Sequence, residues 1–331
     1  MDEEAVPVPI ETTVVGSYPK PPDEGKQFVV RKTLHAIERG EATADDLRAA
    51  QDQLATEVIG EQEAAGVGLV SDGQVRWDDI LTPFARHMAG FEIGGLLRWF
   101  DNNTYYRRPI CMGPVEWRGP SSVDAYRFAS EAATRPVKAV IPGPVTFARM
   151  SQDDHYGAHD DFVLAIARVL AQEAFELEAA GAPVIQIDEP ALLDAPEDLD
   201  LASTALGIVT GELEKAETVL ATYFGDAKRL GPQLFELPVD GIGLDFISGP
   251  ANRELVKEIP PEKKLQAGIA DARNTKLEQE ELLVREITDL AELVGAQRLR
   301  VSPSCGLEYL PRENARAKLA RLSDAAKKVG A

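Results

Sequence analysis

The chain has 331 residues with 44% hydrophobic residues, and its 55 acidic against 35 basic side chains give a net charge of −20. This charge disfavours nucleic acid and anionic membranes as partners, and it suits either a high-salt cytosol or an ordinary acidic enzyme. Two cysteines exclude a disulfide framework, and the absence of a secretory signal and of a long apolar run predicts a cytoplasmic protein without a membrane span.

Short apolar runs of β-type composition alternate along the chain with longer segments of helical pattern. The predicted strands are 12–15, 67–71, 137–141, 183–187, 218–222, 241–246, 265–270 and 298–302. The predicted helices are 42–65, 78–88, 122–133, 160–180, 202–216, 227–236, 253–258 and 276–294, with a last helix from Pro311. Segment 91–113 is aromatic and Arg-rich without helical spacing, so we expect an excursion there, for which a hairpin is one form.

This alternation of strands and helices decides the predicted fold class, which is α/β. Strands that alternate with helices predict a parallel sheet with helical crossovers. Eight such units favour closure into a (β/α)8 barrel, a TIM barrel, and an open doubly wound sheet is the alternative. We found no repeat and no linker, so we expect a single barrel domain over residues 1–331, with a short N-terminal extension and the excursion near 91–113.

Polar side chains follow most of the predicted strands. They are Ser17, Asp72, Gln74, Asp188, Glu189, Asp245, Asp271, Ser302, Ser304 and Cys305. Barrel active sites lie at the C-terminal ends of the strands, where carboxylates can bind an ammonium group, hold a metal or move a proton. Each residue alone is better explained as a helix cap or a loop contact, but the set points to function at this end of the barrel.

Two other kinds of chemistry find little support in the sequence. There is no Walker loop and no G-x-G-x-x-G after a strand, which argues against nucleotide phosphates. None of the four histidines falls at a strand end, which argues against a Ser-His-Asp hydrolase. His155 and His159 are four residues apart, but Gly157 lies between them and breaks a helix, so we expect a solvated pair and no metal site.

Several of the strand-end segments together resemble the cobalamin-independent methionine synthase family. They are VGSYP at 15–19, DGQVR at 72–76, IPGPVT at 141–146, QIDEPAL at 186–192, LPVDGIGLD at 237–245 and PSCGL at 303–307. The segments occur in the family's order and cover the chain from residue 12 almost to its end, and DEPAL and CGL are the most specific of them. The resemblance implies a barrel of the uroporphyrinogen decarboxylase/methionine synthase-like type.

The resemblance also implies a function, that of a methyltransferase of methionine biosynthesis. The methyl group would pass from a methylated folate or a methylcorrinoid donor to the sulfur of homocysteine. Ser17 would hold the homocysteine carboxylate, and Asp188, with Glu189 beside it, would hold the ammonium group. Gln74 stands where the family usually has Glu, which keeps an acceptor and loses one charge. The catalytic residues would be Asp188 and Cys305.

Zinc is central to the resembled family, because zinc holds a thiol as thiolate at neutral pH. Cys305 matches the last-loop cysteine ligand, and Asp245 stands at the position of the Glu ligand. The His-x-Cys ligands are replaced by Thr222 and Phe224, which cannot complete a zinc site. Cys111 could help only if the excursion folded over the barrel mouth, which we do not expect.

These departures keep other hypotheses open. Segments 222–225 and 237–241 resemble the zinc-free N-terminal barrel of the long synthases, whereas the CGL ending resembles their catalytic barrel. The chain could then be a zinc-free companion barrel that does not catalyse transfer alone. Such a barrel would bind either the methyl donor or a partner subunit, namely a paralogous catalytic barrel. A uroporphyrinogen decarboxylase-like site for a polycarboxylate is a third hypothesis, against which DEPAL argues. Trp77, Trp99 and Tyr105 are candidates to stack a pterin, but core packing is the better default for each.

Overall fold

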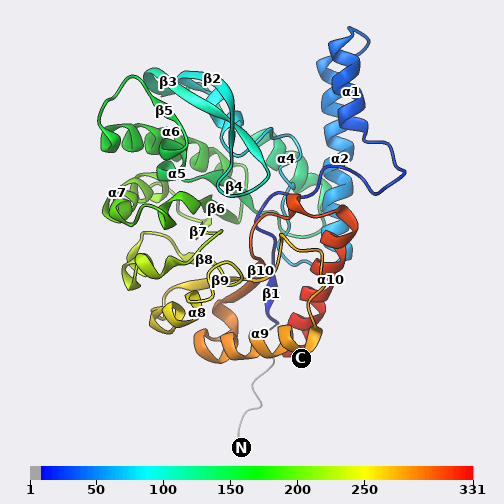
Figure 1. The fold of residues 1–331 in the computed structure, drawn as a ribbon, viewed down its shortest axis with the longest axis vertical. Coiled ribbons are helices and arrows are strands. Elements are labelled where there is room, and N and C mark those ends of the chain that lie inside the picture. The colour runs from blue at the N-terminus through cyan, green and yellow to red at the C-terminus, as the bar shows by residue number, and fades with distance from the viewer. Residues whose placement is uncertain (1–8, 331) are drawn as a thin grey trace, which may run out of the picture.

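The computed structural model describes residues 9–330, and its centre is a closed barrel of parallel strands (Figure 1). The hydrogen-bonded order is β1 (Glu11–Thr12), β10 (Leu299–Pro303), β9 (Lys264–Ala270), β8 (Gly241–Asp245), β7 (Glu217–Ala221), β6 (Val184–Asp188) and β4 (Ala139–Pro142). Parallel bridges from Thr13 to Leu69 and from Val70 to Val137 close the ring between β1 and β4. All eight predicted runs therefore take part, and the barrel is confirmed over the open sheet.

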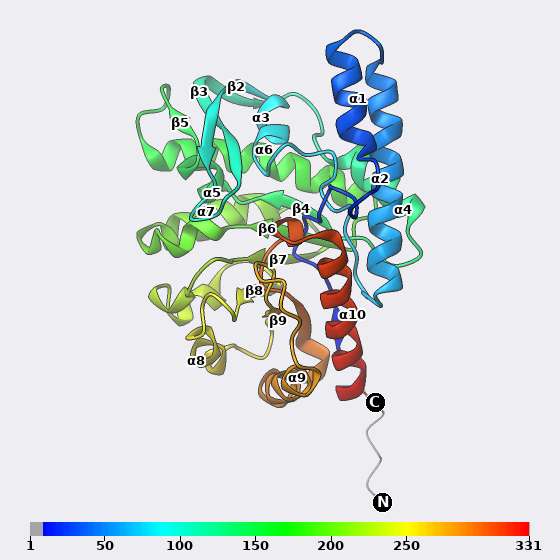
Figure 2. The ribbon, with the colours of Figure 1, turned by 45° about the vertical axis from the view of Figure 1, so that its right-hand side comes forward.

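Helices surround the barrel on its outer side (Figures 1 and 2). They are α1 (Val29–Glu38), α2 (Ala44–Ala64), α3 (Thr82–Arg86), α4 (Val123–Ala132), α5 (Pro144–Arg149), α6 (His159–Ala179), α7 (Leu199–Thr210), α8 (Asn252–Leu255), α9 (Glu280–Val294) and α10 (Arg312–Val329). Each long helix buries one apolar stripe, as Leu283, Ile287, Leu290 and Val294 show on α9. None of the helices in the described part is long and apolar enough to cross a membrane.

Three helix predictions need correction. The predicted helix 78–88 is only the five-residue α3, because the Asp79 carboxylate accepts hydrogen bonds from the amides of Leu81 and Thr82 and so sets a later start. The predicted helix 202–216 ends at Thr210, and 227–236 forms short 3-10 turns. Helix α1, which pairs with α2 to form a projecting arm, was not predicted.

The excursion is an antiparallel hairpin, and it folds over the barrel mouth. It consists of β2 (Met88–Arg98) and β3 (Tyr105–Trp117), with β5 (Gln152–Asp153) beside β3. The ring of Phe100 at its tip lies 5.6 Å from the ring of Phe224 at the mouth. The expectation that the excursion would stay clear of the mouth was therefore wrong. Cys111 nevertheless stays away from the tip, and its thiol donates to the carbonyl of Gly113 at 3.3 Å.

The barrel interior is polar near the amino-terminal ends of its strands and along its axis. Arg300 of β10 donates to Glu11 at 2.6 Å and to Glu217 at 2.9 Å, so this buried cation is paired on two sides. Lys138 and Gln186 are also buried, and they are hydrogen-bonded to each other. Buried charged and amide groups must be hydrogen-bonded to be tolerated, so this interior polar chain is one feature that fixes the relative positions of the strands.

Candidate active site

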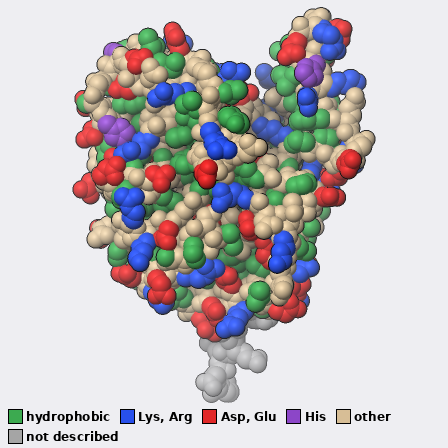
Figure 3. Space-filling view, in the orientation of Figure 1, with side chains coloured by type: hydrophobic (Ala, Val, Ile, Leu, Met, Phe, Trp, Pro, Cys, Tyr) green, Lys and Arg blue, Asp and Glu red, His purple; other side chains and the backbone are tan. Residues whose placement is uncertain are grey.

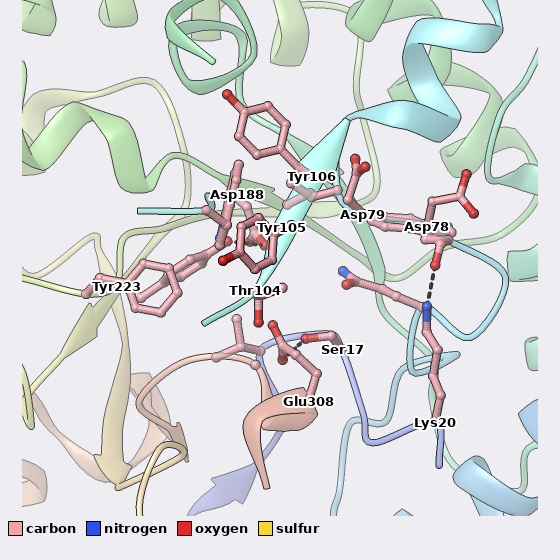
Figure 4. A pocket seen from close by; sticks show the side chains of 17 residues that line it. Ser17, Lys20, Asp78, Asp79, Thr104, Tyr105, Tyr106, Asp188, Tyr223 and Glu308 are labelled. Carbon is pink, nitrogen blue, oxygen red and sulfur yellow. Dashed lines mark hydrogen bonds between the residues drawn. The ribbon is translucent and has the colours of Figure 1, made fainter. Parts of the chain in front are cut away.

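A pocket lies at the carboxyl ends of the strands, under the β2–β3 hairpin (Figure 4). Its polar lining includes Ser17, Gln74, Asp188 and Glu308, and its aromatic lining consists of Trp77, Trp99, Tyr105, Tyr106, Tyr223 and Phe224. The structure thus brings together three of the residues predicted from strand ends, Ser17, Gln74 and Asp188. Glu189, Asp245 and Cys305 are not among the residues that line it. On the surface, a notch separates the α1–α2 arm from the lobe that carries the hairpin (Figure 3).

Asp188 ends strand β6, and its carboxylate is held on both oxygens. Its Oδ1 accepts from Gln186 Nε2 at 2.6 Å, and its Oδ2 accepts from the Tyr223 hydroxyl at 3.1 Å. The side chain is only 2% exposed, and this burial raises the pKa of Asp188 to about 7, against the opposing effects of Gln186, Lys138 and Tyr223. A ligand cation placed beside Asp188 would favour its ionised form.

Ser17 and Glu308 join the first and the last loops of the barrel. The Ser17 hydroxyl donates to the Glu308 carboxylate, and the amide of Leu307 donates to the carbonyl of Ser17 at 3.0 Å. Gly306 is required between them, because a Cβ there would lie 2.0 Å from Ser17 Oγ. Glu308 was missed in the sequence. Its position three residues after Cys305, in the CGLE segment, was the available signal.

Gln74 lies in a tight turn whose backbone is strained. Its φ of 52° is in the left-handed region, which non-glycine residues rarely adopt. The Asp72 carboxylate accepts from the amide of Gln74 at 2.9 Å and holds the turn. The Gln74 side chain packs against Gly16, where an added Cβ would approach Nε2 to 2.6 Å. Strain of this kind is typical of positions where a side chain is held for binding.

Lys20 adds a cation to a pocket that is otherwise acidic. Its ammonium group donates to the carbonyl of Trp77 (Figure 4). Burial lowers the pKa of Lys20, and Asp78 and Glu308 are foremost among the acidic residues that oppose this shift. Among the described residues that line the pocket, Lys20 is the only lysine or arginine. It directly follows the VGSYP segment, which is the signal that could have found it. The excess of carboxylates suits a ligand that carries an ammonium group.

Glu189 is turned away from the pocket and secures the start of α5. Its two carboxylate oxygens accept from the amides of Val145 at 2.8 Å and Thr146 at 2.6 Å. The side chain is fully buried, and this burial raises the pKa of Glu189 to about 7. Carboxylates at a helix N-terminus satisfy amides that have no partner within the helix. In this structure, then, the contacts of Glu189 are those of a helix anchor.

The residues at the expected metal position do not fit zinc. The carboxylate of Asp245 already accepts from the amides of Phe224, Ile247 and Ser248, at 3.1, 2.8 and 2.8 Å. Cys305 is 0% exposed, and burial raises the pKa of its thiol well above the usual value. The Thr222 hydroxyl donates to the carbonyl of Gly243. Within residues 9–330, no cluster of three or more His, Cys, Asp or Glu side chains could hold a metal ion.

Comparisons with known proteins agree with the fold and show the family. The family described as "Cobalamin-independent synthase, Catalytic domain" matches residues 10–328. A methionine synthase of Saccharolobus solfataricus is 32% identical over 322 residues, which cover 97% of this chain and 95% of that protein. One from Sulfurisphaera tokodaii is 32% identical over 321 residues, with coverages of 96% and 91%.

A solved structure gives the same result in three dimensions. It is a B12-independent methionine synthase from a Shewanella species in complex with selenomethionine, and it superposes with a TM-score of 0.84 at 25% identity, covering 97% of this chain and 98% of that one. A Listeria monocytogenes protein of 17% identity superposes with a TM-score of 0.77, covers 97% and 98%, and supports the fold alone.

Proposed function

The chain belongs to the cobalamin-independent methionine synthase family, and from this premise we propose that it methylates the sulfur of homocysteine to form methionine. One observation carries the proposal: Ser17, Gln74 and Asp188, which come from three different strand ends, meet in one pocket with an aromatic wall. The Shewanella relative was solved with selenomethionine, the selenium analogue of methionine, which supports an amino-acid ligand of this size.

In this proposal the pocket binds the amino-acid part of homocysteine at its polar side. Asp188 pairs with the ammonium group, since a buried carboxylate forms a strong charge-assisted hydrogen bond with a cation. The Lys20 ammonium group and the Ser17 hydroxyl, which turns from Glu308 to the ligand, supply donors for the substrate carboxylate, and Gln74 supplies an acceptor for the ammonium group. These contacts place the substrate side chain toward the aromatic wall.

The transfer itself balances without a further reactant. The bond between the donor and its methyl group breaks, a sulfur–carbon bond forms, and the thiol proton ends on the demethylated donor or in solvent. For the donor we propose a methylated folate, because the exposed ring of Tyr105 at the pocket suits stacking against a pterin. Trp77 and Trp99 also line the pocket, but both are buried and pack in T-shaped contacts with neighbouring rings. A methylcorrinoid is the other donor to be tested. No step of this transfer depends on zinc, because the residues at the implied metal position do not fit that ion.

The test is direct synthesis of methionine by the purified chain. Homocysteine is supplied with methylated folate in one arm and with methylcobalamin in the other, and methionine is measured by mass spectrometry. Methionine formed in either arm, and abolished by Asp188→Asn, supports the proposal and identifies the donor. If no methionine forms in either arm, and calorimetry shows that methionine does not bind, the proposal is wrong.

A second candidate function is favoured by the closed metal position. Phe224 and the amide-bound Asp245 occupy the place of the implied ligands, so the chain could serve as a zinc-free companion barrel. It would bind the donor, or a paralogous barrel that carries the missing ligands. Methionine binding without methionine synthesis, together with stimulation of a zinc-containing paralogue by this chain, would select this function over the first.

A further inference from the structure

A buried polar chain connects the interior of the barrel to the pocket. Lys138 lies directly before β4 and is 2% exposed, and its ammonium group donates to Gln186 Oε1 at 2.5 Å. Gln186 of β6 is fully buried, and its Nε2 donates to Asp188 Oδ1 at 2.6 Å and to the carbonyl of Val15 at 2.6 Å. The segment at Val15 is not a sheet neighbour of β6, so these bonds cross the barrel interior.

The ammonium group of Lys138 determines which way the Gln186 amide faces. An ammonium group can only donate, so the amide oxygen must be the atom that faces Lys138. The amide nitrogen then faces Asp188 and donates to its carboxylate, which in the ionised form has no donor and can only accept. Gln266 of β9 adds a second donor to the same amide oxygen at 3.3 Å, which reinforces the orientation.

We propose that Lys138 and Gln186 are positioning residues for the amino-acid pocket: Gln186 fixes the direction of the Asp188 carboxylate, and Lys138, acting through Gln186, favours the ionised form of that carboxylate. The inference rests on the proposed function, in which Asp188 pairs with the substrate ammonium group. Neither Lys138 nor Gln186 lines the pocket. Their effect on the ligand therefore passes through Asp188.

Electrostatics support a dependence of Asp188 on Lys138. The two direct partners of the Asp188 carboxylate, Gln186 and Tyr223, are neutral donors, and Glu308 nearby opposes its ionisation. Lys138 lowers the pKa of Asp188 and so opposes the effect of burial. Loss of the Lys138 charge therefore raises that pKa further.

Lys138 is itself surrounded by charges from several strands. Burial and Arg300 lower its pKa, whereas Asp188, Glu11 and Glu217 raise it. Near the amino-terminal ends of the strands, Arg300 is paired with both Glu11 and Glu217, at 2.6 and 2.9 Å. Those two carboxylates are therefore already partnered by Arg300, whereas Asp188 is reached from Lys138 through a single amide. This arrangement couples the ionisation of Lys138 to that of Asp188.

The experiment measures methionine binding by calorimetry between pH 5.5 and 8.5. Ammonium binding needs the ionised carboxylate, so Lys138→Met should move the acid limb of the affinity profile to higher pH, by about one unit, which is about tenfold in affinity on that limb. In the Asp188→Asn background, Lys138→Met should have no further effect, as expected if it acts only through Asp188. Lys264→Met, which removes another barrel lysine that pairs with Glu217, is the matched control and should leave the profile unchanged.

Other outcomes would overturn the inference. An unchanged acid limb in Lys138→Met, or a loss of affinity that adds in full to that of Asp188→Asn, would show that Lys138 is only structural. If Lys138→Met does not fold, Gln186→Met takes its place with the same expected shift, and a normal profile in that variant is equally decisive. Failure of the wild-type chain to bind methionine at any pH would instead contradict the proposed function.

Discussion

The backbone amide of Phe224 donates to the Asp245 carboxylate at 3.1 Å, and this contact closes the position at which the family resemblance implies a metal. Phe224 has a φ of 75°, an unusual conformation for a residue with a bulky side chain. Its ring packs against Phe100 of the hairpin and Tyr309 of the last loop, with centroid distances of 5.6 and 6.2 Å. Of the implied ligand positions, the one at Phe224 is therefore occupied by an aromatic ring packed against its neighbours, and the one at Asp245 by a carboxylate that already accepts a backbone hydrogen bond.

The purified chain should contain far less than one zinc ion per molecule, with or without homocysteine, and a chelator should leave its Tm unchanged. The reason is that Thr222 and Phe224 offer no metal ligand, so Cys305 and Asp245 alone cannot complete a tetrahedral site. Metal analysis by mass spectrometry checks this. The double variant Thr222→His with Phe224→Cys should gain zinc, and Cys305→Ser in that background should lose it again. Stoichiometric zinc in the wild-type chain would show that other residues supply the ligands.

Cys305→Ser should retain methyl transfer within about threefold, because Cys305 is fully buried and does not line the pocket. The expected cost is in stability, at about 1 kcal/mol, since a buried hydroxyl replaces a thiol that makes a weak hydrogen bond to the Gly306 carbonyl. Initial rates of methionine formation and urea unfolding measure the two effects. Abolished transfer with an intact fold would restore the catalytic role that the resemblance implies for Cys305.

Asp188→Asn should weaken methionine binding about 30- to 100-fold, or ~2–3 kcal/mol, the range for a charged hydrogen bond lost in a buried site. The fold should persist, because asparagine keeps the shape and can still accept from Tyr223. Calorimetry at pH 8 gives the affinity. Tyr223→Phe is the matched control, in which only one neutral donor is removed, and its loss should stay below about tenfold. Equal losses in the two variants would contradict a charge-specific role for Asp188.

The strands were predictable and parts of the site were not, for a physical reason. A strand such as β6, with its run VIQID, is a local apolar pattern that lies within a few adjacent residues, and in β6 the polar residue Asp188 ends it. The pairing of Ser17 with Glu308 joins positions 291 residues apart, and only ring closure brings them together. The direction of Glu189, away from the pocket, depends on the turn before α5. The alternation of side-chain directions along β6 could not predict the direction of Glu189, because Glu189 lies beyond the end of that strand.

Glu189→Gln should lower the unfolding free energy by about 1–2 kcal/mol at pH 5, because both oxygens of the protonated Glu189 carboxyl can still accept from the amides at the start of α5, whereas the side-chain nitrogen of glutamine cannot accept. The difference in unfolding free energy between the wild-type chain and the variant should shrink as the pH rises to 8. The pKa of Glu189 is about 7 in the folded chain, above its ordinary value, so the folded state binds this proton more tightly than the unfolded state does. That stabilisation is present below the unfolded pKa and is lost as the pH rises through about 7. Urea unfolding at pH 5 and pH 8 tests the sign, and a deficit that grows with pH would contradict it.

Arg273→Met should loosen the hairpin and weaken methionine binding three- to tenfold. Arg273 donates to Asn102 at the hairpin tip at 3.1 Å and to Ser248 after β8 at 3.0 Å, and its guanidinium group lies 5.5 Å from the ring centre of Phe224. Loss of these contacts, each worth about 0.5–1 kcal/mol, frees the tip, which carries the Trp99 wall of the pocket. Faster hydrogen exchange at 99–104 would accompany the weaker binding. Arg98→Met removes only an exposed ion pair with Asp101, so it should change neither the exchange rate nor the affinity. Equal effects in the two variants would show that the contacts of Arg273 do not specifically hold the hairpin tip.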